Sequence, residues 1–374
     1  MMLPDAQDHV LPAEDNANRS AQYALTSNNE DRHASFVRCK VSIGLRSGGR
    51  TRGVPNLILY FEQTVAHLHM DTAEDLPFIC TTLASPSDIP KTLINHLVSH
   101  LPHSLPIVGH ITTPRAVTSI TLYTTFQPDT QSFPEFFCVG VLSSELYDDQ
   151  EVRDVLIRFY CSSEKSQRVP SAELAERRFR VGKFMQTWIP LLRRAAGQCH
   201  RLSLGCLHED WVGEVRGLAK EVQPPIIKFL HPPTTPNYTN RVSLPIGWRI
   251  APLQASDIAR VISTSSFRRS VGYIVSRQSY SRSIWIEDRL AGWGLYHSDG
   301  SIGTLYVEEE FRGRKVGSML IDILQHVHLR GGDSPLGVCG WWYVDTTAGG
   351  SDGEQMFSHL RGWEFGWKCF WISL

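Results

Sequence analysis

The residues best suited to chemistry lie in one short run, Arg312-Gly-Arg-Lys-Val-Gly317, in which three cationic side chains stand beside two glycines. Glycine lets a ligand approach the backbone, and the first N–H groups of a helix are free to bind an anion. The helix dipole is positive at the same end, and Arg312, Arg314 and Lys315 would add charge to it. The run therefore predicts a phosphate-binding site. The alternative is a basic helix terminus on a solvated surface.

The segments on either side of this run are the elements that would position it. Ile302 to Val307 is a strand-like stretch, and Glu308 to Gly313 is a charged turn. After the turn, apolar residues recur at helical spacing, which predicts a helix with one buried face from near Lys315. The apolar positions are Val316, Met319, Leu320, Ile323, Leu324 and Val327. A strand, a loop and a helix start in this order form a phosphate cradle.

In this context the run resembles the acyl-CoA pyrophosphate loop of the GNAT acyltransferase superfamily, written Q/R-x-x-G-x-G/A. Arg312 and Gly317 match the pattern, and Lys315 stands in place of the middle glycine. The segment Ala291–Gly300, Val344-Asp345 and Arg361-Gly-Trp363 are similar to the glycine N-acyltransferase-like branch. Members of that branch pair a degenerate N-terminal GNAT-like half with an active C-terminal half.

The resemblance implies an α/β fold with a mixed α+β sheet, in two tandem GNAT-like domains of which the first is degenerate. In a GNAT domain the strand at residues 302–307 and the strand at residues 337–344 would run parallel and then separate. The pantetheine arm of acetyl-CoA or another acyl-CoA would lie between them. The residues that the resemblance places against this co-substrate are Leu305, Tyr306, Val307, Arg312, Gly313, Arg314, Lys315, Val316, Gly317 and Ser318.

Transfer of an acyl group to an amine requires the neutral amine. For a lysine-like amine only about one molecule in 10³ is neutral at pH 7, a handicap of roughly 4.6 kcal/mol, which a general base removes. The resemblance implies a Glu base at the position of Ser301, and serine is no base at neutral pH. Asp345 and His297 are the candidates to replace it, whereas Asp299, next to Gly300, is more typical of a hairpin turn.

Two further positions follow from the resemblance. The residue that protonates the leaving thiolate in many GNAT domains would fall at Ser358, followed by His359. Arg268 and Arg269 border the expected acceptor side and could bind the carboxylate of an amino-acid acceptor. A solvated helix end is the other interpretation of these two arginines.

Composition changes along the chain predict four segments. Residues 1–35 are polar and predict a disordered tail, residues 36–222 a first α/β domain, residues 223–246 a Pro-rich linker, and residues 247–374 the acyltransferase domain. Within the first domain we expect helices at residues 93–101, 149–160 and 172–192. The last part of the chain, residues 363–374, predicts a pair of strands.

The overall composition argues against several classes of function. Lys+Arg 37 against Asp+Glu 38 leaves almost no net charge, so neither nucleic acid nor a membrane surface is an expected partner. No apolar run is long enough to cross a bilayer, and the acidic N-terminus is unlike a signal peptide. The 8 Cys are scattered, and the His run at residues 96–110 has no partner at metal-ligand spacing. A cytoplasmic protein without a metal is expected.

Together these features predict an acyl-CoA-dependent N-acyltransferase, with acetyl-CoA as donor. The acceptor would be a small amine or an amino acid that attacks the thioester directly in a ternary complex. Two alternatives remain open at this stage. One is a catalytically impaired CoA-binding module, indicated by Ser301, Ser358 and Lys315; the other is a protein-modifying acetyltransferase with the first half as docking platform. The oligomeric state is left open.

Overall fold

A computed structural model describes eleven stretches of the chain. They are residues 41–45, 57–61, 66–68, 78–113, 117–145, 153–165, 171–196, 200–233, 243–265, 269–331 and 340–374. The tail expected at residues 1–35 and the expected acceptor residue Arg268 lie outside these stretches.

Strands make up most of the fold. They are β1 (Val41–Leu45), β2 (Leu57–Phe61), β3 (Ala66–Leu68), β4 (Phe78–Leu83), β5 (Val117–Thr124), β6 (Cys138–Glu145), β7 (Arg153–Cys161), β8 (His200–His208), β9 (Glu221–Val222), β10 (Ile226–His231), β11 (Trp248–Ala251), β12 (Ser281–Ile286), β13 (Arg289–Tyr296), β14 (Ile302–Val307), β15 (Trp342–Thr347) and β16 (Glu364–Ser373).

The helices lie between these strands in sequence. They are α1 (Lys91–Val98), α2 (Leu105–Thr112), α3 (Ser171–Ala196), α4 (Val212–Arg216), α5 (Ile258–Thr264), α6 (Val271–Arg277), α7 (Val316–Gly331) and α9 (Asp352–His359). Short 3-10 helices are η1 (Pro86–Asp88), η2 (Ser162–Lys165), η3 (Glu209–Trp211), η4 (Ala255–Asp257), η5 (Gln278–Tyr280) and η6 (Glu309–Phe311).

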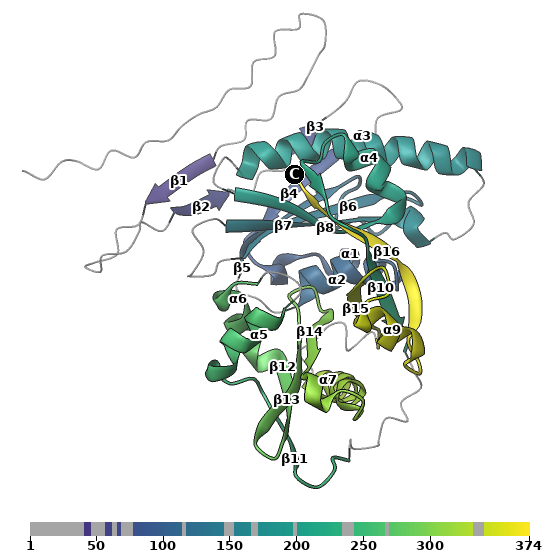
Figure 1. Ribbon diagram of the computed structural model, residues 1–374. Helices are drawn as coiled ribbons and strands as arrows, with labels where there is room; N and C mark the ends of the chain where they lie inside the picture. The colour runs from purple at the N-terminus through teal and green to yellow at the C-terminus, as the bar shows by residue number, and fades with distance from the viewer. Residues whose placement is uncertain are drawn as a thin grey trace, which may run out of the picture.

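One mixed 14-stranded sheet runs through both halves of the protein, in the order β11-β12-β13-β14-β15-β10-β16-β8-β7-β6-β5-β4-β3, with β9 beside β16. β14 and β15 are parallel, as are β7 and β8, and their other neighbours are antiparallel. Each parallel pair is joined by a helix, α7 in the second half and α3 in the first (Figure 1). The expected α/β class with a mixed sheet is confirmed.

The two halves exchange strands where they meet. β10, which precedes the second half in sequence, lies between β15 and β16. In return β16, the last strand of the chain, pairs with β8 and β9 of the first half. Residues 226–231 were expected in a linker, and the correction has a physical reason. All six residues of β10 are buried, so the prolines around them end the strand but do not exclude it.

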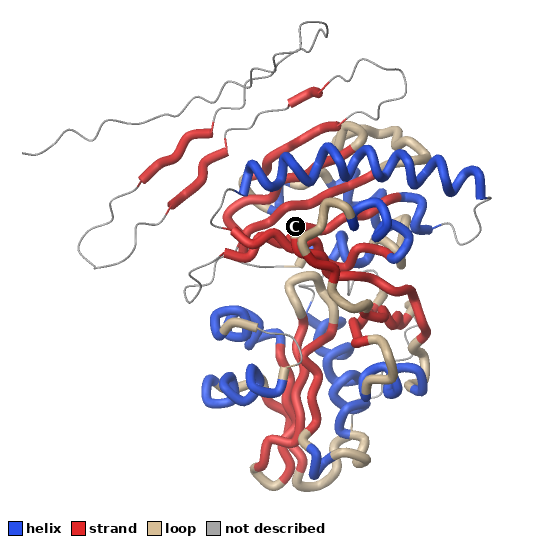
Figure 2. The backbone as a smooth tube through the Cα atoms, turned by 45° about the horizontal axis from the view of Figure 1, so that its top comes forward, coloured by secondary structure: helices blue, strands red, loops and turns tan. Residues whose placement is uncertain are grey.

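Helices cover both faces of the sheet (Figure 2). In the first half α3 and α4 pack on one face, and α1 and α2 pack in the apolar core on the other. In the second half α5 and α6 pack on one face of β13, while α7 packs on the other face with β12 and β13. Both faces of the strands that surround the candidate site are therefore supported.

Two other secondary-structure expectations are wrong. Residues 153–160, expected within a helix at residues 149–160, belong to the strand β7. Between Val155 and Cys161 six of the seven residues are buried, and a run with so little alternation cannot be distinguished from a helix by periodicity. Residues 364–373, expected as a pair of strands, form the single long strand β16.

Candidate functional site

The strands β14 and β15 separate as soon as they meet. Their one parallel pair in register is Ile302 with Val344, and beyond it a cavity of about 1360 Å³ opens between them. The cavity continues from the start of α7 to the first-half residues Leu156, Arg158 and Ser203. The expected separation of these two strands is confirmed.

A bulge in β14 lies just after the point of separation. Trp293 pairs with Tyr306, and Leu295 pairs with Gly303. An advance of two residues along β13 therefore corresponds to three residues along β14. The backbone of Thr304 has a positive φ of 49° there. A bulge leaves backbone groups outside the ladder, so this edge of β14 can hydrogen-bond an extended ligand in the cavity.

Two residues in the loop before α7 have a left-handed backbone. Gly313 has a φ of 74° and Lys315 a φ of 64°, so Lys315 adopts the left-handed conformation that glycine takes most easily. The helix begins at Val316, with its first N–H groups beside the cavity. Nine of the ten residues expected to contact the co-substrate line the cavity. Arg314 does not, and its guanidinium lies 5.6 Å from the centre of the Phe311 ring.

Asp299 is the most constrained charge in the site. Arg158 of β7 donates to its Oδ2 at 2.6 Å, and both side chains are at most 5% exposed. Ser301 donates to Oδ1 through its amide at 3.1 Å and its hydroxyl at 2.7 Å. Burial alone would raise the pKa of Asp299, but Arg158 above all, together with Lys228 and the hydrogen bond from Ser301, holds it well below its ordinary value. Asp299 therefore stays ionised and is unsuited to accept a proton.

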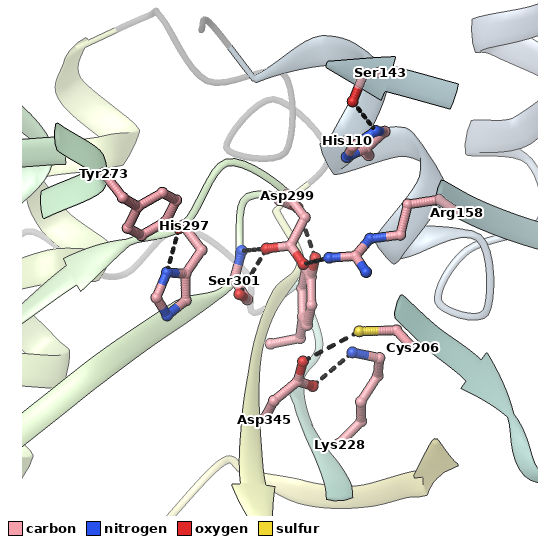
Figure 3. Close-up of polar contacts among 11 residues, drawn as sticks. His110, Ser143, Arg158, Cys206, Lys228, Tyr273, His297, Asp299, Ser301 and Asp345 are labelled. Atoms are coloured by element: carbon pink, nitrogen blue, oxygen red, sulfur yellow. Dashed lines mark hydrogen bonds and ion pairs between the residues drawn. The ribbon is translucent and has the colours of Figure 1, made fainter. Parts of the chain in front are cut away.

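A second buried ion pair lies beside the first (Figure 3). Lys228 of β10 donates to Oδ1 of Asp345 at 2.5 Å, and Cys206 of β8 donates to Oδ2 at 3.4 Å. Lys228 is fully buried; burial would lower its pKa, but Asp345 raises it above the ordinary value. Asp345 is 17% exposed and lines the cavity. Both of its carboxylate oxygens have partners, of which the Cys206 thiol on Oδ2 is the weaker donor.

The sulfurs of Cys206 and Cys369 and a carboxylate oxygen of Asp345 lie within 4.8 Å of one another, which is close enough for metal ligands. Lys228 already places a positive charge at this carboxylate. The protein itself thus supplies the cation of this cluster.

His297 lies at the point where the two strands part. Its Nδ1 is 2.6 Å from the hydroxyl of Tyr273 on α6 (Figure 3), and the ring lines the cavity. Burial, with Arg269 next in importance, lowers the pKa of His297 to about 3. The imidazole is therefore neutral at physiological pH.

The structure brings only some of the candidate residues from the sequence together in the cavity. His297, Ser301, Asp345 and Arg269 all line the cavity. Ser358 does not: it is exposed and donates to the carbonyl of Gln355 within its own helix, whereas its neighbour His359 does line the cavity. Asp299 does form the expected turn, with the Gly300 amide donating to the His297 carbonyl at 3.0 Å, but it also anchors Arg158.

Sequence reasoning missed the two buried cations and Tyr273. Arg158 and Lys228 each interrupt an apolar strand, in Val155–Cys161 and Ile226–Leu230. A lone charge in such a strand must find a buried partner, and this signal was available in the sequence. In the expected His-rich run, His110 pairs with Ser143 at 2.9 Å (Figure 3).

No helix in the described stretches combines the length and the apolar character needed to cross a bilayer.

Among known proteins, similarity is found in solved structures. No protein-family model matches the sequence, and no curated protein matches it. The structure is similar to that of a Drosophila protein, with a TM-score of 0.50 and 16% identity over 80% of this chain and 98% of that chain.

Two acetyltransferases are among the other structural neighbours. A GCN5-related N-acetyltransferase from Sphaerobacter thermophilus has a TM-score of 0.41 and 14% identity over 79% of this chain and 95% of that chain. An acetyltransferase of the GNAT family from Colwellia psychrerythraea has a TM-score of 0.39 and 10% identity over 79% of this chain and 98% of that chain. At these identities the likeness concerns the fold alone.

Proposed function

We propose that the protein is an acyl-CoA-dependent N-acyltransferase that transfers an acyl group, with acetyl-CoA as donor, to a small amine or amino acid. The observation that carries the proposal is the cavity between β14 and β15, which starts at the free N-terminus of α7 and ends at a cluster of buried charges. We also propose that the protein is related to the glycine N-acyltransferase-like branch, whose two tandem halves would agree with a sheet that runs through both halves of this chain.

In this proposal the co-substrate lies along β14. The diphosphate would bind the amides of Val316 to Ser318, where the helix dipole favours an anion. Arg312 and Lys315 line the same end of the cavity and would add charge-assisted hydrogen bonds. The pantetheine arm would pair with the open edge of β14 at Leu305 to Val307, and this places the thioester near the bulge at Thr304.

Acyl transfer then needs a partner for the proton that the amine loses. Asp345 is suited to this role because it lines the cavity and the partner of its Oδ2 is a weak donor, the Cys206 thiol at 3.4 Å. The Ser301 hydroxyl donates a hydrogen bond to Asp299, so its oxygen can accept a hydrogen bond from the amine, but serine is no base at neutral pH. Arg269, at the same end of the cavity, would favour an acceptor that carries a carboxylate.

Isothermal titration with acetyl-CoA and CoA tests the binding step. We expect both to bind, and Arg312→Gln to weaken binding about tenfold or more, the effect of one charge-assisted hydrogen bond. Arg314→Gln is the matched comparison, because Arg314 carries the same charge two residues on but does not line the cavity. Equal losses of acetyl-CoA affinity in the two variants would mean that the diphosphate does not lie at the start of α7 beside Arg312.

Release of free thiol from acetyl-CoA over a panel of amines and amino acids tests the reaction. Thiol release above the rate of solvent hydrolysis separates an enzyme from a CoA-binding module. If CoA binds and no acceptor raises thiol release, the transferase proposal is wrong and the module remains.

A further inference from the structure

We propose that His297 protonates the leaving sulfur of the thioester through Nε2. Tyr273 would supply a proton to the other ring nitrogen, Nδ1, and Gly303 provides the space that the imidazole occupies. This inference rests on the proposed function and assigns a proton donor to it. None of the motifs in the sequence indicates Tyr273 or Gly303 for such a role.

The position of the imidazole is the first argument. Gly303 directly follows Ile302, the residue at which β14 and β15 make their last contact in register. A Cβ added to Gly303 would lie 2.5 Å from Cδ2 of His297 and closer still to Nε2. The ring therefore occupies the place of a side chain at the first residue where the strands part. A thioester that runs along β14 from the helix terminus would reach its reactive end at this point.

The second argument is the hydrogen bond between the Tyr273 hydroxyl and Nδ1 of the His297 ring. Tyr273 comes from α6, which packs against β13, and its hydroxyl lies 2.6 Å from Nδ1. When this hydroxyl donates to Nδ1, the ring proton is on Nε2, the nitrogen beside Gly303. In this arrangement Tyr273 selects the tautomer that places a donor beside Gly303.

The charge state of the ring is the third argument. His297 is neutral, because burial and the nearby cations Arg269, Arg277 and Arg158 outweigh the attraction of Asp299. A ring that resists a second proton must receive one at Nδ1 as it gives one up at Nε2. A tyrosine hydroxyl at Nδ1 meets this requirement.

The reaction balances as follows. The amine nitrogen forms a bond to the carbonyl carbon, the carbon–sulfur bond breaks with its electron pair going to sulfur, and the nitrogen loses one proton to Asp345. Sulfur takes the Nε2 proton of His297, and the phenol proton of Tyr273 moves to Nδ1. The proton held by Asp345 returns through solvent to the Tyr273 oxygen, while the ring returns to its first tautomer. The products are the amide and CoA thiol.

Gly303→Ala tests the inference without touching His297. Gly303 is not among the residues with positive φ, so alanine can adopt its backbone, but the new methyl group must displace the imidazole. We expect Gly303→Ala and His297→Gln each to lower kcat about 10²-fold, as the loss of a general acid does. The double variant Gly303→Ala/His297→Ala should be no slower than His297→Ala. Tyr273→Phe should lower kcat about fivefold.

Two controls separate catalysis from folding. Gly213→Ala on α4, where an added Cβ meets nothing within 4 Å, should keep full activity. Acetyl-CoA affinity, measured by calorimetry, should stay unchanged in all variants. Imidazole added to the solution should restore part of the kcat of His297→Ala but none of that of Gly303→Ala, in which the methyl group fills the space.

The outcomes distinguish this inference from the proposed function. A wild type that turns over while Gly303→Ala and His297→Gln keep full kcat overturns the role of His297 and leaves the transferase intact. Absence of imidazole rescue, together with lost acetyl-CoA affinity, reduces His297 to a structural residue and also overturns it. A wild type that binds no acyl-CoA ends both proposals.

Discussion

Removing Arg158 should destabilise the whole fold, because it leaves the Asp299 carboxylate without its counter-ion. The side chains of this pair are 3% and 5% exposed, and the pair joins β7 of the first half to the turn before β14. Breaking a buried ion pair by removing one partner costs about 3–5 kcal/mol, since the remaining charge is uncompensated. Ser301 keeps its two hydrogen bonds to Asp299, which places the expectation for Arg158→Met at the lower end of this range.

The comparison variant is Arg289→Met. Arg289 also pairs with a carboxylate, that of Glu310, but the two side chains are 61% and 48% exposed. An exposed pair contributes about 0–1 kcal/mol, so the two methionine variants should differ by about 2–4 kcal/mol. The free energy of unfolding is measured by urea titration at pH 7. The double variant Arg158→Met/Asp299→Asn should cost less than the sum of the two single changes.

The pH dependence gives the prediction a second test. The folded-state pKa of Asp299 is lower than its value in an unfolded chain, so its stabilisation is present above about pH 4 and is lost as pH falls below that value. The difference between wild type and Arg158→Met should therefore narrow below about pH 4. If Arg158→Met lowers the free energy of unfolding at pH 7 by no more than Arg289→Met does, the buried pair does not contribute the stability that we assign to it.

Three other predictions concern the site and its support. The left-handed backbone costs a residue other than glycine about 1–2 kcal/mol, which exceeds the added entropy that glycine loses on folding. Lys315→Gly should therefore raise the free energy of unfolding by up to about 1 kcal/mol. A lower urea midpoint would contradict this. The pKa of His297, about 3 when folded, is below its unfolded value, so stability is lost as pH falls below about 6.5. At pH 5 the free energy of unfolding lost in this way is at most about 2 kcal/mol, and the loss should be absent in His297→Gln. If the stabilities of the wild type and His297→Gln change in parallel with pH, this prediction is wrong. The fragment of residues 247–374 should show no cooperative thermal transition in circular dichroism, because it lacks the buried strand β10. A cooperative transition would show that the second half folds alone.

The local parts of the site could be predicted from the sequence. Residues 302–317 contain their own signals: a β-rich run, a charged turn with glycine, and an apolar face at helical spacing. These signals involve neighbours along the chain, and the structure places a strand, a loop and a helix at the expected positions. The left-handed backbone at Lys315 was not predicted, although the glycine of the matching pattern at this position was a signal for it.

The partners of the buried charges could not be predicted in the same way. Arg158 meets Asp299 across 141 residues, and Lys228 meets Asp345 across 117. Neither contact has a local pattern, and both depend on the exchange of β10 and β16 between the halves. Asp299 illustrates the difficulty, because its position before Gly300 fully accounts for it as a turn residue while its side chain has a second partner far away in sequence.

The charges of the cavity show why the two halves cannot be considered separately. The two carboxylates of these ion pairs, Asp299 and Asp345, belong to the second half, and their cations, Arg158 and Lys228, precede it in the chain. Without these cations Asp299 would lose the charge that compensates its burial, and removing one partner of a buried pair costs about 3–5 kcal/mol. In the proposed transferase, the segments that precede the second half would therefore contribute to the electrostatics of acyl transfer. Under that proposal, a first half that supplies Arg158 has a chemical reason to be retained.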